Sequence, residues 1–480
     1  MIMMGRQQPQ KELFSYQIDL DQRVRADNPL RQVAAAIDFS WARAEVASTY
    51  GYNGNVSVDP VVIVKLMFLL FFDNVRSERQ LLEMVPERLD YLWFLGLGIN
   101  DPVPHHSVLS KARSRWGGPV FEKLFMRTVA ECVRAGLVDG QKIHVDGSLI
   151  AAHAANKSIV DGPPELVAAL RQACQEQTAK LTEASPVPAP QGAANQTHVS
   201  TTDPDAELAR KRHTPAQLSY KHHRVVDNAE GVITAQDTTG GSVPEDGQLF
   251  GLIQKHELNT TVAVATAVTD SQYGTVENLL ACADQGITAH LADLQTARRG
   301  KGQPAARFAP ERFVYDAATD TYQCPAGEKL RRYQRKTNKP AWEYKASRRA
   351  CSQCPLRAQC TTSKRGRRLQ RYDRQEELDR LRLIANSRAA KKDRRRRMHL
   401  MEGSFADATN CHGFKRARWR RLWRQKIQNH LIAACQNVRI LIKSRRCRLP
   451  AAVAVSTLPP GSWWAPVKGL PAADQPWSFN

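Results

Sequence analysis

The chain has 480 residues, 42% of them hydrophobic, which is enough to fill the cores of several domains and excludes an intrinsically disordered protein. Its 69 lysines and arginines outnumber its 47 aspartates and glutamates, and the formal net charge of +22 favours a polyanionic partner, nucleic acid before an anionic membrane. The longest apolar run, 60–72, contains Lys65 and is shorter than the roughly 20 residues that cross a bilayer, so we expect no membrane segment.

The first residues carry no apolar signal-peptide core, so we expect a cytoplasmic protein. In that compartment the 10 cysteines are expected to be thiols or metal ligands rather than disulfides.

Residues 30–136 predict a helical N-terminal domain, because apolar residues recur there at helical spacing. Near its end, in 101–116, Ser107 can cap a helix. The face of this helix that we expect to be exposed carries Lys111, Arg113 and Arg115. Two interpretations stay open for these residues: a DNA-contacting helix of a helix-turn-helix-like domain, or an ordinary solvated basic face.

The middle of the chain predicts a mixed α/β sheet, because a strand and a β-hairpin are followed by alternating helices and strands. The expected strands are 142–154, the hairpin pair 219–226 and 232–239, 261–269, and 287–293.

Asp146 is an unusual residue for the interior of the first predicted strand. An unpaired buried charge is costly enough that it usually shifts its pKa, finds a partner or binds a metal. The alternative is an aspartate that caps the turn at Gly147. Asp270 closes the strand 261–269, so the two carboxylates would share one region of the sheet if their strands are neighbours.

A cysteine-containing stretch follows at 295–375 and predicts a metal site with Cys324, Cys351, Cys354 and Cys360 as ligands. Zinc takes four such ligands in a tetrahedron, and the C-x2-C pair within the set would supply two from one tight turn. An iron–sulfur cluster would use the same thiolates, and free thiols in a loop-rich subdomain are the remaining alternative.

The last structured part, 376–446, predicts helices with a strongly basic segment. Glu402 is the only acid in RRRRMHLMEGSF, and Trp419 and Trp423 stand among the basic residues that follow. Crowded like charges usually form a solvated face, but an isolated acid beside them favours phosphate binding here.

These patterns divide the chain into six parts. We predict an N-terminal arm at 1–29, the helical domain 30–136, a first core part 137–294 with a mobile insertion at 156–217, the basic cysteine insertion 295–375, the completion of the core at 376–446, and a Pro-rich tail at 447–480.

Three carboxylates therefore stand out: Asp146 within a strand, Asp270 at a strand end, and Glu402 beside basic residues. Carboxylates are hard ligands for Mg²⁺ or Mn²⁺, and two such ions can activate an attacking oxygen and stabilise a leaving one in phosphodiester displacement.

The sequence resembles bacterial insertion-sequence transposases of the DDE type. VDPVVIVKLMFLL and DPVPHHSVLSKAR are similar to the N-terminal helical domain of that family, and KIHVDGSLIAAHAANKS is similar to its first-Asp strand. SYKHHRVVD and VTDSQYGTVENL are similar to the second and fourth strands of its catalytic core, and MEGSFADATNCHGFKRARWRRLW is similar to its Glu-containing helix. The resemblance implies a ribonuclease H-like core, with Asp146, Asp270 and Glu402 as the catalytic acids that bind Mg²⁺ or Mn²⁺. It also implies double-stranded DNA as partner, a homo-oligomer, and neither a membrane nor a small-molecule substrate.

The second acid departs from the family pattern, because Asp270 is followed by Ser-Gln-Tyr-Gly where many relatives carry Lys-Gly-Tyr. Tyr273 is kept, which favours Asp270 over Asp237, at the end of a hairpin strand, and Asp227, in the hairpin turn.

Nine basic residues are predicted to contact DNA, with surface solvation as the alternative for each: Lys111, Arg113, Arg115, Lys221, Arg224, Arg397, Lys415, Arg416 and Arg420. The competing function is a non-catalytic, basic nucleic-acid-binding protein with a structural zinc cluster. Asp146 discriminates between the two functions, because a binding module needs no acid in a central strand.

Overall fold

The structure is a computed structural model that describes residues 18–51, 56–179, 192–210, 214–292 and 308–448. The chain divides into two units, Met1–Ile442 and Lys443–Asn480, and the first contains both larger sheets and the candidate site. Much of the predicted arm and nearly all of the predicted tail lie outside the described residues.

The N-terminal region is helical, as predicted. Its central helix is α4, Pro60–Phe72, which begins where the Asp59 carboxylate accepts a hydrogen bond from the Val61 backbone N–H. Every residue of α4 except Lys65 is buried, and the Lys65 ammonium donates to the Phe94 carbonyl oxygen at 2.6 Å. Among the described residues, no helix combines the length and the apolar character needed to cross a membrane. The neighbouring helices are α2 Pro29–Ala36, α3 Ala42–Val46, α5 Glu78–Met84, α6 Leu89–Leu95, α7 Ser107–Trp116 and α8 Pro119–Arg134.

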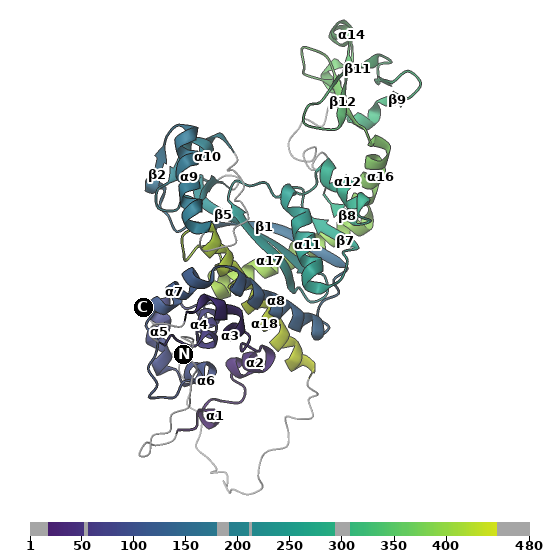
Figure 1. Ribbon diagram of the computed structural model, residues 1–480. Helices are drawn as coiled ribbons and strands as arrows, with labels where there is room; N and C mark the ends of the chain where they lie inside the picture. Colours follow the sequence, from purple (N-terminus) through teal and green to yellow (C-terminus); the bar gives the residue numbers. More distant parts are fainter. Residues whose placement is uncertain (1–17, 52–55, 180–191, 211–213, 293–307, 449–480) are drawn as a thin grey trace, which may run out of the picture. The chain divides into compact units, whose positions relative to one another are not determined.

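The main sheet has six strands, and β1, Lys142–Ala151, is central in it (Figure 1). β1 pairs antiparallel with β5 and parallel with β7, β5 also pairs antiparallel with β4 and β6, and β7 pairs parallel with β8. Apart from the short strand β4, three antiparallel strands, β1, β5 and β6, are followed in the chain by two strands parallel to β1, β7 and β8. This order, with the first strand at the centre, is that of ribonuclease H-like folds. The predicted mixed α/β class is therefore confirmed. The other strands are β4 Glu207–Ala209, β5 Gln217–Asp227, β6 Ile233–Gly240, β7 Thr266–Thr269 and β8 Thr288–Leu291.

The two faces of β1 are covered by different helices. Ile143 and Val145 belong to a core shared with α11, Leu249–Thr260, and α12, Val276–Asp284. Residues of the other parity face α17, Arg388–His412, as the ion pair between Lys142 and Asp393 shows. Because side chains alternate along a strand, Asp146 belongs to the face that meets α17.

Strand β7 covers only the second half of the predicted strand 261–269. Thr261 adopts a left-handed conformation, with φ of 59°, and ends α11 there. The apolar, β-branched residues that follow it were expected to be extended throughout, but they first connect the helix to the sheet.

The region predicted as a mobile insertion, 156–217, contains helices and strands in its described part. β2, Ile159–Asp161, pairs with β3, His198–Ser200, and α9, Pro164–Ala179, and α10, Ala193–Thr197, lie between them in the chain. Polar side chains anchor the segment: the buried Asn195 both donates to and accepts from the Leu208 backbone. Hydrophobic periodicity cannot reveal such anchoring. Residues 180–191 and 211–213 of this prediction lie outside the described residues.

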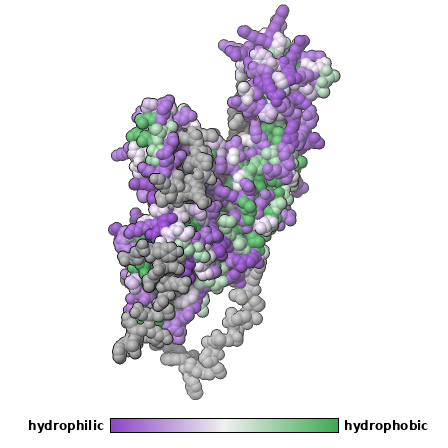
Figure 2. All heavy atoms as spheres, in the orientation of Figure 1, coloured by the Kyte–Doolittle hydropathy of each residue, from purple (hydrophilic) through white to green (hydrophobic). Residues whose placement is uncertain are grey.

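The cysteine-containing stretch forms a second, antiparallel sheet in the order β13-β12-β11-β10-β9. Its core is small and aromatic, with Phe313, Tyr322 and Tyr344 among its members, and Figure 2 shows mostly hydrophilic residues on its visible face. Residues 295–307 of this prediction are not described. The bounds are β9 Val314–Asp316, β10 Thr321–Gln323, β11 Lys329–Arg335, β12 Ala341–Ala346 and β13 Arg368–Tyr372, and the helices α16 Gln375–Ala385, α17 and α18 Leu422–Arg448 follow.

Candidate active site

The pairing of β1 with β7 brings two of the predicted acids together. The parallel register runs from Lys142 opposite Thr266 to His144 opposite Val268. Two residues further along both strands, Asp146 comes level with Asp270, which directly follows β7. The two strands are therefore neighbours, which is the condition under which the two acids were expected to share one region of the sheet.

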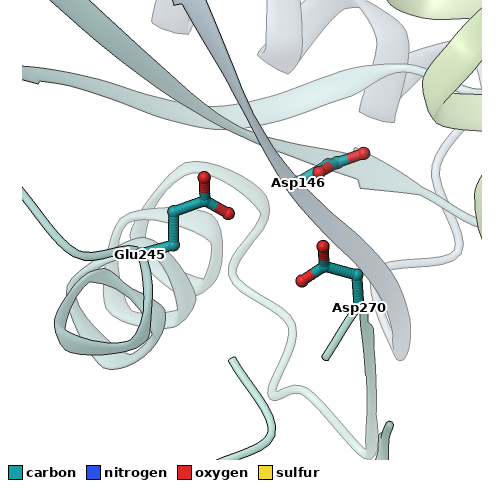
Figure 3. A group of neighbouring side chains, drawn as sticks. All are labelled: Asp146, Glu245 and Asp270. Carbon is teal, nitrogen blue, oxygen red and sulfur yellow. The ribbon is translucent and has the colours of Figure 1, made fainter. Parts of the chain in front are cut away.

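Glu245 is the third acid at this place. It lies between β6 and the short helical turn Asp246–Gln248 that leads into α11. One carboxylate oxygen from each of Asp146, Glu245 and Asp270 can be chosen so that all three lie within 4.8 Å of one another. Figure 3 shows these side chains and the three separate segments that carry them. We call this group the carboxylate centre; within the described residues, no other group of three or more acids, histidines or cysteines meets this distance.

The absence of a side chain at Gly147 makes room for Glu245. A Cβ atom at this position would lie 2.9 Å from the Glu245 carboxyl carbon, too close for both to stay in place. The Gly147 backbone N–H also donates to Asp146 at 2.8 Å. The glycine next to the first acid thus lets an acid from another element approach the same strand.

Two cations partly compensate the carboxylate centre. Arg397 of α17 forms an ion pair with Asp146 at 2.8 Å, and the Lys221 ammonium lies 3.7 Å from Glu245. Burial raises the pKa of Asp146, Arg397 opposes this rise, and the charge of Asp270 adds to it. Burial likewise raises the pKa of Glu245 to about 7, against the opposing charge of Lys221. Three acids against two cations leave a site that can accept a divalent metal ion.

Glu402, the third acid predicted from the sequence, is not a member of the carboxylate centre. It is exposed on α17, five residues beyond Arg397. In an α-helix, five residues correspond to a rotation of about 140° and a rise of about 7.5 Å, so the two side chains leave the helix in different directions. The structure therefore brings together Asp146 and Asp270 and leaves Glu402 apart from them.

Glu245 has no distinctive sequence pattern around it. It lies in a VPEDGQ segment, where acids are common because turns are exposed and helix starts favour negative charge. Only the path of the chain from β6 to α11 reveals that this turn reaches β1.

The two competitors of Asp270 have other roles. Asp237 forms ion pairs with Lys255 at 2.7 Å and Lys426 at 3.0 Å. Burial raises the pKa of Asp237, but these two lysines outweigh burial and hold it below its usual value. The buried Asp227 accepts hydrogen bonds from the backbone N–H groups of Gly140 and Ala229, both at 2.8 Å, as expected for a turn aspartate.

Two family models match the chain. One, described as Transposase domain (DUF772), matches residues 18–115, and the other, Transposase DDE domain, matches residues 323–442. The chain belongs to the DDE transposases of bacterial insertion sequences. The second match begins at the last residue of β10 and covers the rest of the cysteine-containing sheet and the helix that carries Glu402. A comparison with curated proteins found no match.

Two basic residues of this transposase that were predicted to contact DNA are buried. The prediction that Arg113 lies on the exposed face of α7 is wrong: it is buried, forms an ion pair with Glu78 and stacks its guanidinium 4.0 Å from the Trp419 ring. Arg224 is completely buried and donates to Ser404 Oγ at 2.7 Å. Both arginines therefore stabilise the fold, and neither presents a surface to DNA.

The remaining predicted cations fall into two sets. Lys221 and Arg397 serve the carboxylate centre, and Lys415 donates to Ser148 Oγ, two residues beyond Asp146 on β1. Four others are exposed: Lys111, Arg115, Arg416 and Arg420. Arg416 also lines a cavity of about 760 Å³ between the N-terminal helices and the segment before α18, together with Arg76, Arg79, His106, His153 and Arg418.

The four cysteines predicted to bind a metal surround a small cavity of about 20 Å³. Burial raises the pKa of the Cys360 thiol, Arg367 opposes this rise, and the other three thiols add to it, so the four groups are neighbours. No three of their Sγ atoms, all of which the structure describes, lie within 4.8 Å of one another. We call these residues, Cys324, Cys351, Cys354 and Cys360, the cysteine group.

Proposed function

We propose that this transposase catalyses metal-dependent cleavage of DNA at the ends of an insertion sequence and joins the freed 3′-hydroxyl groups to target DNA. The observation that carries the proposal is the level placement of Asp146 and Asp270 on neighbouring parallel strands at the centre of a ribonuclease H-like sheet. A protein that only binds DNA has no need of this juxtaposition of acids.

The donor set fits Mg²⁺ or Mn²⁺, because carboxylate oxygens from separate segments come within 4.8 Å of one another in a half-buried site. Asp146 and Asp270 would hold the metal. When bound, such ions activate the attacking oxygen and stabilise the leaving oxygen of a phosphodiester. Arg397, which pairs with Asp146, would orient a DNA phosphate beside the acids.

We propose Glu402 as the third acid of the triad. Its support is the resemblance of MEGSFADATNCHGFKRARWRRLW to the Glu-containing helix of the family, within the residues that match the DDE domain. Because Glu402 is exposed, while the same helix contacts β1 through Arg397, its participation requires α17 to turn or shift against the sheet. DNA binding along this basic helix is the event that would drive such a change.

We propose that DNA is bound by the exposed cations Lys111, Arg115, Arg416 and Arg420. The net charge of +22 and the arginine-lined cavity beside Arg416 support this role. Because transposition brings two element ends together, we also expect the active form to contain at least two copies of the chain.

The cysteine group is proposed to hold a structural Zn²⁺ ion. Four thiols around one small cavity are a suitable donor set for tetrahedral zinc. The metal content of the purified full-length protein distinguishes zinc from iron. If the protein contains neither metal, these residues are free cysteines.

The test uses a DNA duplex that carries the inverted repeats flanking the coding region. With Mg²⁺, the wild-type protein should nick or cut this duplex at the repeat ends, and Asp146→Asn and Glu402→Gln should reduce cleavage to background. Both variants should keep their affinity for the duplex, because neither residue is a cation. Cleavage that survives Asp146→Asn would contradict the proposal and favour the competing function, a non-catalytic DNA-binding protein.

A further inference from the structure

We propose that Glu245 is a metal-binding residue of this transposase and holds the divalent cation together with Asp146 and Asp270. The inference rests on the proposed function and goes beyond it, because it adds an acid outside the Asp146, Asp270 and Glu402 triad. Three observations carry it: the convergence of three chain segments, the missing side chain at Gly147, and an unpartnered hydroxyl group beside the acids.

The convergence is unfavourable unless something compensates it. Three carboxylates within 4.8 Å of one another repel, and the two nearby cations balance only part of the charge. The Lys221 ammonium is bound to the Val243 carbonyl oxygen at 2.7 Å and stays 3.7 Å from Glu245, too far for a hydrogen bond. No described residue donates a hydrogen bond to the Glu245 carboxylate, whose side chain is only 16% exposed.

The second observation is the space that Gly147 leaves. β1 could carry alanine here without backbone strain, since this glycine is not among those with positive φ. Its added Cβ would, however, lie 2.9 Å from the Glu245 carboxyl carbon. The lack of a side chain at this point of the strand is therefore tied to the position of Glu245.

The third observation is Tyr273, whose side chain is completely buried and whose hydroxyl group has no hydrogen-bond partner. It follows Asp270 by three residues, and the charges of Glu245, Asp146 and Asp270 all act on its hydroxyl group. A buried phenol normally finds a partner, because leaving it unpaired costs about 1–3 kcal/mol. We therefore assign Tyr273 as a positioning residue, whose unpaired hydroxyl group would bind a ligand held by the acids, such as a water molecule of the metal ion.

The test is a titration of the full-length protein with Mn²⁺ alone, without DNA and without turnover. Electron paramagnetic resonance of the free ion measures how much Mn²⁺ is bound. Glu245→Gln should weaken Mn²⁺ binding at least tenfold, the lower end of the about 10- to 100-fold losses seen when groups around a metal are removed. Gly147→Ala, which keeps all three acids but displaces Glu245, should weaken binding in the same direction. Tyr273→Phe should have a smaller effect.

The matched controls are Asp246→Asn, which removes the neighbouring charge, and Gly251→Ala, which adds a methyl group to α11 in open space. Both should bind Mn²⁺ as the wild type does. If Asp146→Asn abolishes binding while Glu245→Gln and Gly147→Ala leave it unchanged, the inference is overturned and the proposed function stands. If Asp146→Asn also binds Mn²⁺ normally, the proposed function fails as well.

Discussion

The carboxylate centre and the cysteine group are both predicted metal sites, yet the fold prepares them to different degrees. The three acids already lie within 4.8 Å of one another. The register of β1 and β7 brings Asp146 and Asp270 together, Gly147 leaves room for Glu245, and two cations reduce the repulsion. The four thiols surround one cavity but do not meet that distance. They come from turns and short helices around a small sheet, in which few large side chains are buried.

From this difference we expect strand pairing in a large core to assemble a site before the ligand arrives, and a site on short loops to need the ligand to complete its fold. The first kind of site should therefore survive metal removal, and the second should not. Each of the following changes tests one side of this comparison.

The largest effect is expected for Cys354→Ser. Structural zinc contributes on the order of 10 kcal/mol to the folding of small metal-binding units, so this variant should lose zinc and the fold of residues 308–372. Limited proteolysis should cut this region while Mn²⁺ binding at the carboxylate centre persists. Cys411→Ser, which changes a free cysteine of α17, is the control and should keep both zinc and protease resistance. If the second sheet stays intact in zinc-free Cys354→Ser, the cysteine group does not need its metal to fold, and the expected difference between the two sites is wrong.

The next effect concerns the cations that stabilise the metal-free carboxylate centre. The Arg397 and Asp146 side chains are 12% and 24% exposed, so Arg397→Met should destabilise the metal-free protein by more than the ~1 kcal/mol of surface pairs and approach the ~3–5 kcal/mol of buried ones. Mn²⁺ should restore much of this loss in denaturant unfolding. The control is Arg396→Met, which changes an exposed arginine of the same helix. Equal destabilisation of the two variants would show that the ion pair with Asp146 contributes nothing special.

Asp203, a buried acid outside both metal sites, provides a contrast through the pH dependence of stability. Burial raises the pKa of Asp203 to about 6 from 3.8, against the hydrogen bond from the Tyr220 hydroxyl group. The folded state therefore favours the protonated form of Asp203. The contribution of this acid to the free energy of unfolding is fully present below about pH 4 and is lost, by up to about 3 kcal/mol, as the pH rises through about 6. Asp203→Asn should remove this pH dependence of the free energy of unfolding. Adding Mn²⁺ to the wild type should leave the pH dependence unchanged. The same pH profile in wild type and Asp203→Asn would contradict the assignment.

The smallest effect is expected for a cation that belongs to neither metal site. Arg416 is exposed, so Arg416→Ala should lower the salt dependence of DNA binding by about one phosphate contact, a slope change of about 0.9. Arg224→Met would be a poor test of DNA contact, because that arginine is completely buried and its loss would act on stability. An unchanged salt slope in Arg416→Ala would remove this residue from the DNA-binding surface.

Sequence patterns predicted most of what local chemistry decides. The helical N-terminal region, the hairpin and the strand with Asp146 followed from periodicity and turn residues. The positions of Asp146 and Asp270 in their predicted strands placed both acids in one region of the sheet, and the resemblance implied their catalytic role. Glu245 could not be predicted, because only the path of the chain from β6 to α11 brings its turn to β1. Arg113 was misassigned for a related reason: the face of α7 that it occupies is buried against Glu78 and Trp419, which come from distant parts of the chain.

We propose that Asp146, on β1, and Asp270, directly after the neighbouring strand β7, form the catalytic metal site. This assignment is tested by Mg²⁺-dependent cleavage of the repeat-end duplex by Asp270→Asn and Asp237→Asn, two variants that each neutralise an acid associated with the main sheet. We predict that Asp270→Asn loses cleavage and that Asp237→Asn, whose native carboxylate is paired with Lys255 and Lys426, retains it. Cleavage retained by Asp270→Asn and lost in a folded Asp237→Asn protein would contradict the account.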